Sequence, residues 1–101
     1  MNHPTFEFHP EALREAWEAR RWYAGRDRRA AMSFLAELDR AQEQVVAHPE
    51  RWPTYLHGTR RFRHRRFPYL IVYHAQPERI VVLAVAHAKR RPGYWNTRQP
   101  E

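Results

Sequence analysis

The sequence predicts an α+β fold of the order β-α-α-β-β-β, in which a helical hairpin packs on one face of an antiparallel sheet. Two observations lead to this prediction. Apolar residues recur at helical spacing in two adjacent segments between Pro10 and His48, and three apolar or alternating segments follow Gly58. A chain of 101 residues is long enough for one small core, so we expect residues 1–101 to form a single domain.

The first two elements are a short strand and a helix. Thr5–Phe8 alternates polar and aromatic side chains, which is typical of a strand with one buried face. Pro10 suits the first position of a helix and Gly25 suits its end. The apolar face expected for this helix comprises Leu13, Ala16, Trp17 and either Tyr23 or Ala24.

A second helix follows almost at once. Asp27 is a good N-cap residue, and Pro49 disfavours helical geometry in the residue before it, so the helix is expected to end near His48. Because only a short turn separates the two helices, they should lie antiparallel. The apolar stripe expected on the second helix comprises Ala31, Phe34, Leu35, Leu38, Ala41 and Val45.

The second half of the chain reads as a loop and three strands. The loop covers Pro49–Gly58, and the strands are predicted at Arg60–Arg66, Tyr69–Ala75 and Arg79–Ala86. The short turn Gln76–Glu78 indicates a hairpin between the last two strands. Consecutive strands joined by short connections predict an antiparallel sheet.

Charge is divided unevenly between the two halves. Residues 1–50 hold 7 Arg and 9 acidic residues, which gives −2, whereas residues 51–101 hold 10 Arg, 1 Lys and 2 acidic residues, which gives +9. Such asymmetry indicates a polyanionic or acidic partner for the second half. The alternative is a basic surface that is simply solvated.

Several classes of protein are disfavoured by composition. The chain has no cysteine, so neither disulfide nor thiolate chemistry is available. Its seven histidines show no HExxH or similar spacing and its three glycines are scattered, so no metal and no cofactor are expected. No signal peptide is visible, and the apolar run Ile80–Ala86 is too short to span a bilayer. We therefore expect a soluble, cytoplasmic protein with no membrane partner.

One predicted strand carries a row of arginines. Period-two alternation places Arg61, Arg63 and Arg65 on one face, and Phe62 and His64 on the other. Like charges in one row repel each other unless an anion or an acidic chain neutralises them, so the row is a candidate binding surface. The alternative is an edge strand that is charged to prevent aggregation.

A second basic cluster, mixed with aromatic residues, begins where the last strand ends. Basic and aromatic side chains together suit stacking against nucleobases. The alternative for Trp95 is that it plugs the open end of the core. His87 is a candidate general acid or base, or a structural residue. The cluster comprises His87, Lys89, Arg90, Arg91, Tyr94, Trp95 and Arg98.

Five phrases of the sequence carry a resemblance to a known family. They are residues 6–13, Trp22–Tyr23, residues 48–51, Arg65–Tyr69 and Val85–Trp95. In order and spacing they resemble toxins of the RelE/ParE superfamily, which belong to type II toxin–antitoxin pairs. The resemblance spans nearly the whole chain and implies the α+β fold described above. Toxins of this superfamily act on ribosome-bound mRNA or on DNA gyrase.

The resemblance to the RelE-type ribonucleases is incomplete. Two lysines of their pattern align with Arg61 and Arg63, and arginine keeps the charge but cannot transfer a proton. Leu70 stands where those enzymes have an arginine that grips the phosphate. Arg90, and more loosely Tyr94, match the remaining functional positions.

A ribonuclease therefore remains an alternative rather than the preferred interpretation. Other members of the superfamily cleave RNA with a histidine near the C-terminus, which makes His87 the candidate here. If the chain is a ribonuclease, its catalytic residues would be His87, Arg90 and Tyr94.

The resemblance favours the ParE branch, whose better-known members poison DNA gyrase without being nucleases. A further alternative is an inactive relative that only binds an antitoxin. The implied partner is a cognate antitoxin, bound in a toxin–antitoxin hetero-oligomer through Arg61 and Arg63. The residues expected to meet the target or a nucleic acid are Arg65, Lys89, Arg90, Arg91 and Arg98.

Overall fold

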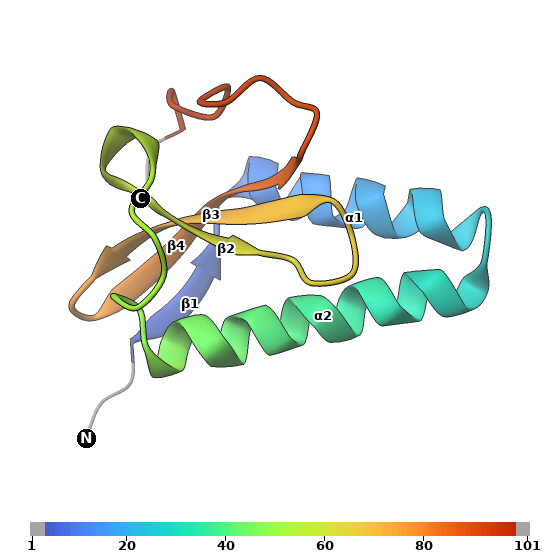
Figure 1. The fold of residues 1–101 in the computed structure, drawn as a ribbon, viewed down its shortest axis with the longest axis horizontal. Coiled ribbons are helices and arrows are strands. Elements are labelled where there is room, and N and C mark those ends of the chain that lie inside the picture. The colour runs from blue at the N-terminus through green and yellow to red at the C-terminus, as the bar shows by residue number, and fades with distance from the viewer. Residues whose placement is uncertain (1–3, 99–101) are drawn as a thin grey trace.

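The structure is a computed structural model, and it describes residues 4–98. Two helices lie side by side as an antiparallel hairpin against a four-stranded sheet (Figure 1). This arrangement confirms the predicted α+β fold. The elements are β1 (Thr5–Phe8), α1 (Pro10–Ala24), α2 (Arg28–Ala47), the short 3₁₀ turn η1 (Leu56–Gly58), β2 (Arg60–Arg63), β3 (Tyr69–Gln76) and β4 (Arg79–His87).

The sheet is mixed rather than wholly antiparallel. Its strand order is β1-β4-β3-β2, and β2, β3 and β4 pair antiparallel as predicted. β1 instead pairs with β4 in parallel, from Thr5 opposite Arg79 to Phe8 opposite Val82. The direction of β1 differs from the prediction because side-chain alternation identifies a strand and its buried face but does not specify its neighbour.

Small residues form the buried face of α1. Ala12, Ala16 and Ala19 are buried and recur about once per helical turn, which allows the helix to lie close to the sheet. The predicted face was therefore wrong for Leu13 and Trp17, which are 45% and 51% exposed. The large hydrophobic side chains of α1 indicated the wrong buried face, because close packing of a helix on a sheet favours alanine over larger side chains.

The second helix agrees more closely with its prediction. The Asp27 side chain accepts a hydrogen bond of 2.9 Å from the backbone N–H of Arg29, which confirms Asp27 as the N-cap. Leu35 lies at the edge of the apolar stripe and is 37% exposed, whereas Leu38 packs against the core. The buried residues of α2 are Ala31, Phe34, Ala41 and Val45.

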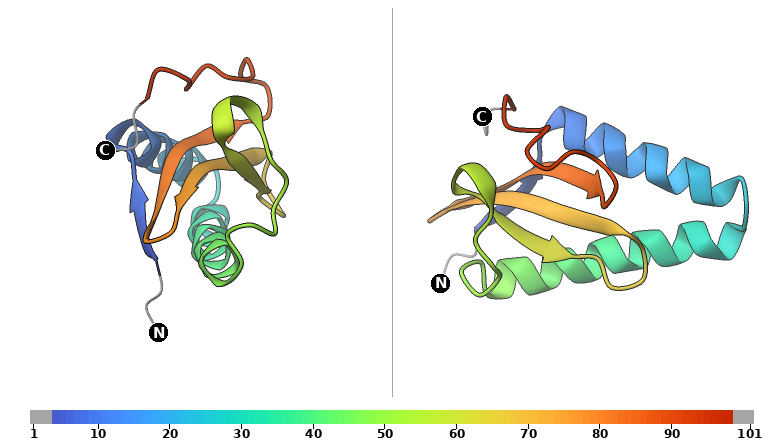
Figure 2. Two further views of the ribbon diagram at one scale, coloured as in Figure 1. Left: turned by 90° about the vertical axis from the view of Figure 1, so that its left-hand side faces the viewer. Right: turned by 45° about the horizontal axis from the view of Figure 1, so that its top comes forward.

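The face of the sheet away from α2 is covered by the segment that follows β4. Figure 2 shows residues 88–98, in red, running over this face. Trp95 in this segment is 1% exposed and packs against Val72, Val81 and Leu83. The structure thus supports the structural interpretation of Trp95, which closes a second small core.

The strand β2 is shorter than predicted, although its alternation is as predicted. It ends at Arg63, because the chain then turns back toward β3 through residues 64–68. Phe62 and His64 are buried at 4% and 1% exposure, while Arg61 and Arg63 are exposed. The period-two pattern therefore identified the inner and outer faces correctly.

His64 is buried without a hydrogen bond. Its ring stacks on Phe34, with 5.1 Å between ring centroids, and neither ring nitrogen has a hydrogen-bond partner within residues 4–98. Burial lowers the pKa of His64, and the nearby carbonyl of Phe34 and carboxylate of Glu37 oppose this effect only in part. The neutral ring is thus the form that suits the folded protein.

The depressed pKa of His64 predicts that acid destabilises the fold at this position. As the pH falls below the ordinary histidine value of 6.5, the unfolded chain binds a proton that the folded chain does not. The wild type should therefore lose more stability than His64→Phe, by at most about 1.4 kcal/mol per pH unit. Denaturant unfolding of both proteins between about pH 7.5 and pH 5 checks this. Equal losses of unfolding free energy in the wild type and in His64→Phe over this pH range would contradict it.

Candidate functional site

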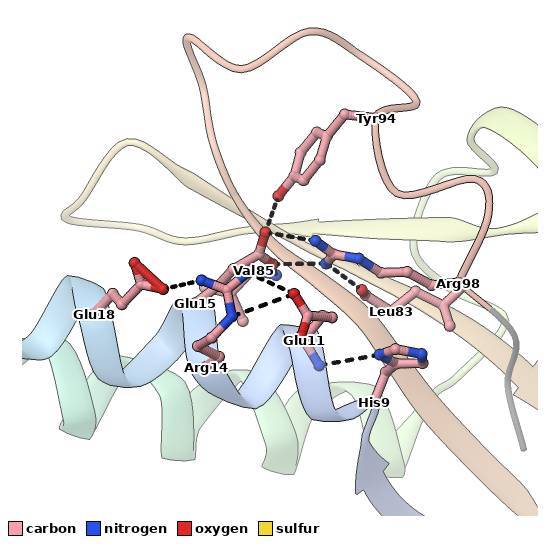
Figure 3. A network of polar contacts seen from close by, with 9 residues as sticks. All are labelled: His9, Glu11, Arg14, Glu15, Glu18, Leu83, Val85, Tyr94 and Arg98. Carbon is pink, nitrogen blue, oxygen red and sulfur yellow. Dashed lines mark hydrogen bonds and ion pairs between the residues drawn. The ribbon is translucent and has the colours of Figure 1, made fainter.

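A buried carboxylate joins α1 to β4 and to the segment after it. The Glu15 side chain is 10% exposed, and its two oxygens accept four hydrogen bonds (Figure 3). The donors are the backbone N–H of Val85 at 3.0 Å, the hydroxyl of Tyr94 at 2.6 Å, and the two terminal nitrogens of Arg98 at 2.9 and 3.0 Å. One carboxylate thus joins three parts of the chain, namely α1, β4 and the segment after β4.

The position of Glu15 follows from the sheet topology. β1 pairs with residues Arg79–Val82 of β4, so within residues 4–98 the outer edge of β4 has no neighbouring strand from Leu83 onward. Arg98 donates to the carbonyl of Leu83 at 2.8 Å, and Glu15 accepts from the N–H of Val85. These two side chains therefore satisfy backbone groups that a strand would otherwise have paired.

Arg98 was predicted to contact a target, and the structure gives it another role. Its side chain is 12% exposed and its guanidinium is held by Glu15 and Leu83. We therefore leave Arg98 out of the target-facing residues and regard it as the residue that fastens the end of the described chain.

Tyr94 is held in the same network. Its ring contacts the guanidinium groups of Arg90 and Arg98, which lie 3.8 and 5.1 Å from its centroid. Burial, together with the hydrogen bond to Glu15, raises the pKa of Tyr94 far above its ordinary value. At neutral pH the hydroxyl is therefore protonated and already donates to Glu15, so it cannot act as a general base in this arrangement.

His87 occupies the last position of β4. Its Nδ1 accepts a hydrogen bond of 3.0 Å from the backbone N–H of Lys89, and its ring meets the ring of Tyr69 edge-on at 5.1 Å. The bond to Lys89 fixes the tautomer that carries its proton on Nε2 whenever the ring is neutral. His87 therefore has a structural task, as a cap for the turn after β4.

The three residues predicted to be catalytic in a ribonuclease do lie together. They line a cleft between α1 and the end of β4, which we call the tyrosine cleft and whose volume is about 610 Å³. Lys89 and Arg91 are exposed in the same segment, beside Arg90. The residues that line the tyrosine cleft are Glu15, Glu18, Ala19, Trp22, Tyr23, Pro68, Tyr69, Val85, His87, Arg90 and Tyr94.

Sequence reasoning missed Glu15 as the organiser of this cleft. The signal was present locally, because Glu15 lies between Ala12 and Ala19 on the alanine face of α1. An acidic residue on a face packed against a sheet indicates a buried polar partner. The partner, Arg98, lies 83 residues away in the sequence, and no local pattern connects the two.

A second cleft collects the arginines of the β2 region, and we call it the arginine cleft. Its volume is about 770 Å³. Arg65, predicted to meet a target, lines this cleft, and its Nε lies 3.9 Å from a carboxylate oxygen of Glu37. The lining residues are Arg40, Trp52, Pro53, Arg61, Phe62, Arg63, Arg65, Pro68, Tyr69, Leu70 and Ala88.

Residues 4–98 contain neither a metal-binding cluster nor a membrane-spanning helix. No group of three or more histidine or acidic side chains is arranged to hold a metal ion in this part of the chain. Neither described helix combines the length and the apolar character needed to cross a membrane.

One comparison with known proteins shows the family of the chain, and another supports its fold. The family model described as the ParE toxin of the type II toxin–antitoxin system parDE matches residues 6–92. A solved structure entitled "Chromosomal ParDE TA system from P. aeruginosa" superposes with a TM-score of 0.74 and 11% sequence identity. The superposition covers 86% of this chain and 98% of that one, and at this identity it supports the fold alone. No curated protein matches the chain.

The Glu15 network predicts a large difference between two glutamates of the same helix. Glu15→Ala should destabilise the fold by about 3–5 kcal/mol, because it leaves the guanidinium of Arg98 buried without an acidic partner. Glu18 is exposed and contacts only Arg14 among the described ion pairs, so Glu18→Ala should cost no more than about 0.5 kcal/mol. Tyr94→Phe should lie between them, at about 1 kcal/mol. Equal losses in chemical denaturation for Glu15→Ala and Glu18→Ala would contradict this account.

Proposed function

Since the chain belongs to the family of ParE toxins of type II toxin–antitoxin systems, we propose that it inhibits bacterial growth and is neutralised by a cognate antitoxin. The observation that carries this proposal is the extent of the family match. Residues 6–92 include all of the helical hairpin and, apart from Thr5 at the start of β1, all four strands.

We further propose that its target is DNA gyrase, and through gyrase DNA replication, rather than mRNA. The support comes from the positions that a RelE-type nuclease would use. Arg61 and Arg63 replace the lysines of that pattern and cannot transfer protons at any relevant pH. Leu70 replaces the phosphate-binding arginine, and its side chain packs in the apolar cluster around Trp95. The hydroxyl of Tyr94 is occupied by Glu15.

One specific observation favours the alternative of a ribonuclease. His87, Arg90 and Tyr94 line a single cleft, although they come from β4 and the segment after it. In such an enzyme His87 would exchange a proton through Nε2 and Arg90 would bind the phosphate. Nδ1 of His87 already accepts a hydrogen bond from Lys89, and the hydroxyl of Tyr94 already donates to Glu15. These two residues are therefore less suited to catalysis here than the ribonuclease pattern requires.

The two basic regions suggest two separate contact surfaces. Lys89, Arg90 and Arg91 are exposed in the segment after β4, where a large target could reach them, so we propose that they face the target. Arg61 and Arg63 are exposed on β2, and we propose that they contact the antitoxin. Steering by the strongly basic second half of the chain would speed the association with an acidic antitoxin.

Expression of the chain alone should arrest bacterial growth, and co-expression of its antitoxin should restore it. The purified protein should inhibit DNA supercoiling by gyrase and leave mRNA intact in cell-free translation. The reason is that Arg61 and Arg63 replace the proton-carrying lysines of the nuclease pattern, and Leu70 replaces its phosphate-binding arginine. Paired supercoiling and translation assays on one protein preparation provide the measurement.

Two variants sharpen this test. Arg90→Glu with Arg91→Glu should relieve toxicity while the fold and most antitoxin affinity remain, because both side chains are exposed beyond the last strand. Codon-placed mRNA cleavage that is abolished by His87→Ala would instead establish the ribonuclease. Unimpaired growth at confirmed soluble expression would identify an inactive relative that only binds antitoxin.

A further inference from the structure

The outer side of the helical hairpin exposes a group of apolar side chains. Six large hydrophobic side chains are exposed within residues 4–98, and four of them belong to this group, namely Leu13, Trp17, Met32 and Leu35. A hollow of about 170 Å³ between the helices is lined by Leu13, Trp17 and Leu35, and Met32 lies one helical turn before Leu35. Exposed apolar patches of this kind mark contact sites. We call this surface the hairpin face.

The four side chains occupy matched levels along the antiparallel helices (Figure 1). Trp17 lies seven residues before the end of α1, and Leu35 lies seven residues after the start of α2. Because both helices rise about 1.5 Å per residue, Trp17 and Leu35 stand level with each other. Leu13 lies one turn farther from the connection between the helices, and Met32 lies one turn nearer to it. The apolar group is therefore centred on Trp17 and Leu35.

Opposite charges separate along the same face. Arg28 and Arg29 are exposed beside the connection between the helices, whereas Asp39 and Glu43 are exposed toward the other end of α2. Within residues 4–98 none of these four side chains has an ion-pair partner. Arg28 lies about 10 Å along the helix from Leu35 in one direction, and Glu43 about 12 Å in the other. The hairpin face is thus basic at one end, apolar in the middle and acidic at the other end.

We propose that the hairpin face binds a second copy of the chain, so that the free toxin forms a symmetric dimer with its two hairpins antiparallel across the interface. A twofold axis at the level of Leu35 places the basic end of each copy over the acidic end of the other. Arg28 then meets Glu43 of the second copy. Met32 of each copy likewise reaches the level of the other copy's Leu13. This inference concerns the free toxin and does not depend on the identity of its target.

The charge pattern favours a second copy over an unrelated partner. A twofold interface requires a face that is complementary to itself after rotation, and the hairpin face meets this requirement about Leu35. A parallel arrangement would instead place Arg28 over Arg28 and Glu43 over Glu43, and like charges in an interface are unfavourable. A surface that meets a different protein does not need this internal symmetry.

The size of the hairpin face suits a reversible dimer. With 20 residues α2 is about 30 Å long, and two packed helices are together about 20 Å wide. Allowing for the shorter α1, the face offers about 500 Å² per copy, or about 1,000 Å² in total, which lies at the low end of specific interfaces. A tryptophan at the centre supplies the kind of anchor that dominates interface energy. We therefore expect association that depends on protein concentration.

Sedimentation equilibrium of the full chain, without antitoxin, tests the dimer. The mass should rise from 12.3 kDa toward twice that value as the concentration increases. Trp17→Glu should weaken association by about tenfold or more, because it places a charge at the apolar centre. Trp22→Glu is the matched control and should leave association unchanged, since Trp22 is equally exposed on α1 but lines the tyrosine cleft. In NMR spectra the indole signal of Trp17, and not that of Trp22, should move with concentration.

A charge exchange tests the antiparallel arrangement. Arg28→Glu alone and Glu43→Arg alone should each weaken association, because each places like charges opposite one another. The double variant should restore it. Both substitutions suit the helix dipole, since they put an acidic residue in the first turn of α2 and a basic residue near its end, so the fold should persist. Circular dichroism of each variant checks the fold.

Four results would overturn the inference. The first is a chain that stays monomeric at every concentration. The second is a dimer that survives Trp17→Glu or responds equally to Trp22→Glu. The third is a double charge variant that associates no better than the single variants. The fourth is a monomeric chain in which Trp17→Glu prevents co-purification of the antitoxin, which would assign the hairpin face to the antitoxin instead of a second copy.

Discussion

The hydrogen bonds of the Glu15 carboxylate hold both the edge of β4 and the chain segment that follows β4. It closes the edge of β4 through Val85 and holds Tyr94 and Arg98 at the end of the described chain. A buried ion pair gains little over an apolar substitute, but removal of one partner leaves a charge stranded at a large cost. The network therefore makes one arrangement of the terminal segment far better than its alternatives.

This constraint shapes the surface we propose as functional. The segment with Lys89, Arg90 and Arg91 is anchored by His87 where β4 ends, and by Tyr94 and Arg98 against Glu15. The basic residues between these anchors are thus presented on a loop whose two ends are fixed. The arginine cleft is built separately, from β2 and α2, and it shares only Pro68 and Tyr69 with the tyrosine cleft. A toxin with two such surfaces can meet a partner at one while the other remains accessible.

Interactions between residues close in sequence made much of the fold predictable. The Asp27 cap, the stripe of α2 and the alternation from Arg61 to His64 each depend on neighbours a few residues away. The direction of β1 and the alanine face of α1 depend on which element packs against them, so local patterns gave the wrong answer. The pairing of Glu15 with Arg98 arises from the tertiary fold and has no local signature.

Hydrogen exchange of the backbone amides in residues 88–98 tests the central claim most directly, because it reports the ordering of this segment rather than total stability. Our account predicts that the wild type protects amides near Trp95, and that Glu15→Gln releases them while amides in β3 and in the middle of α2 keep their protection. A segment whose exchange is the same in both proteins would contradict the claim that Glu15 holds it in place.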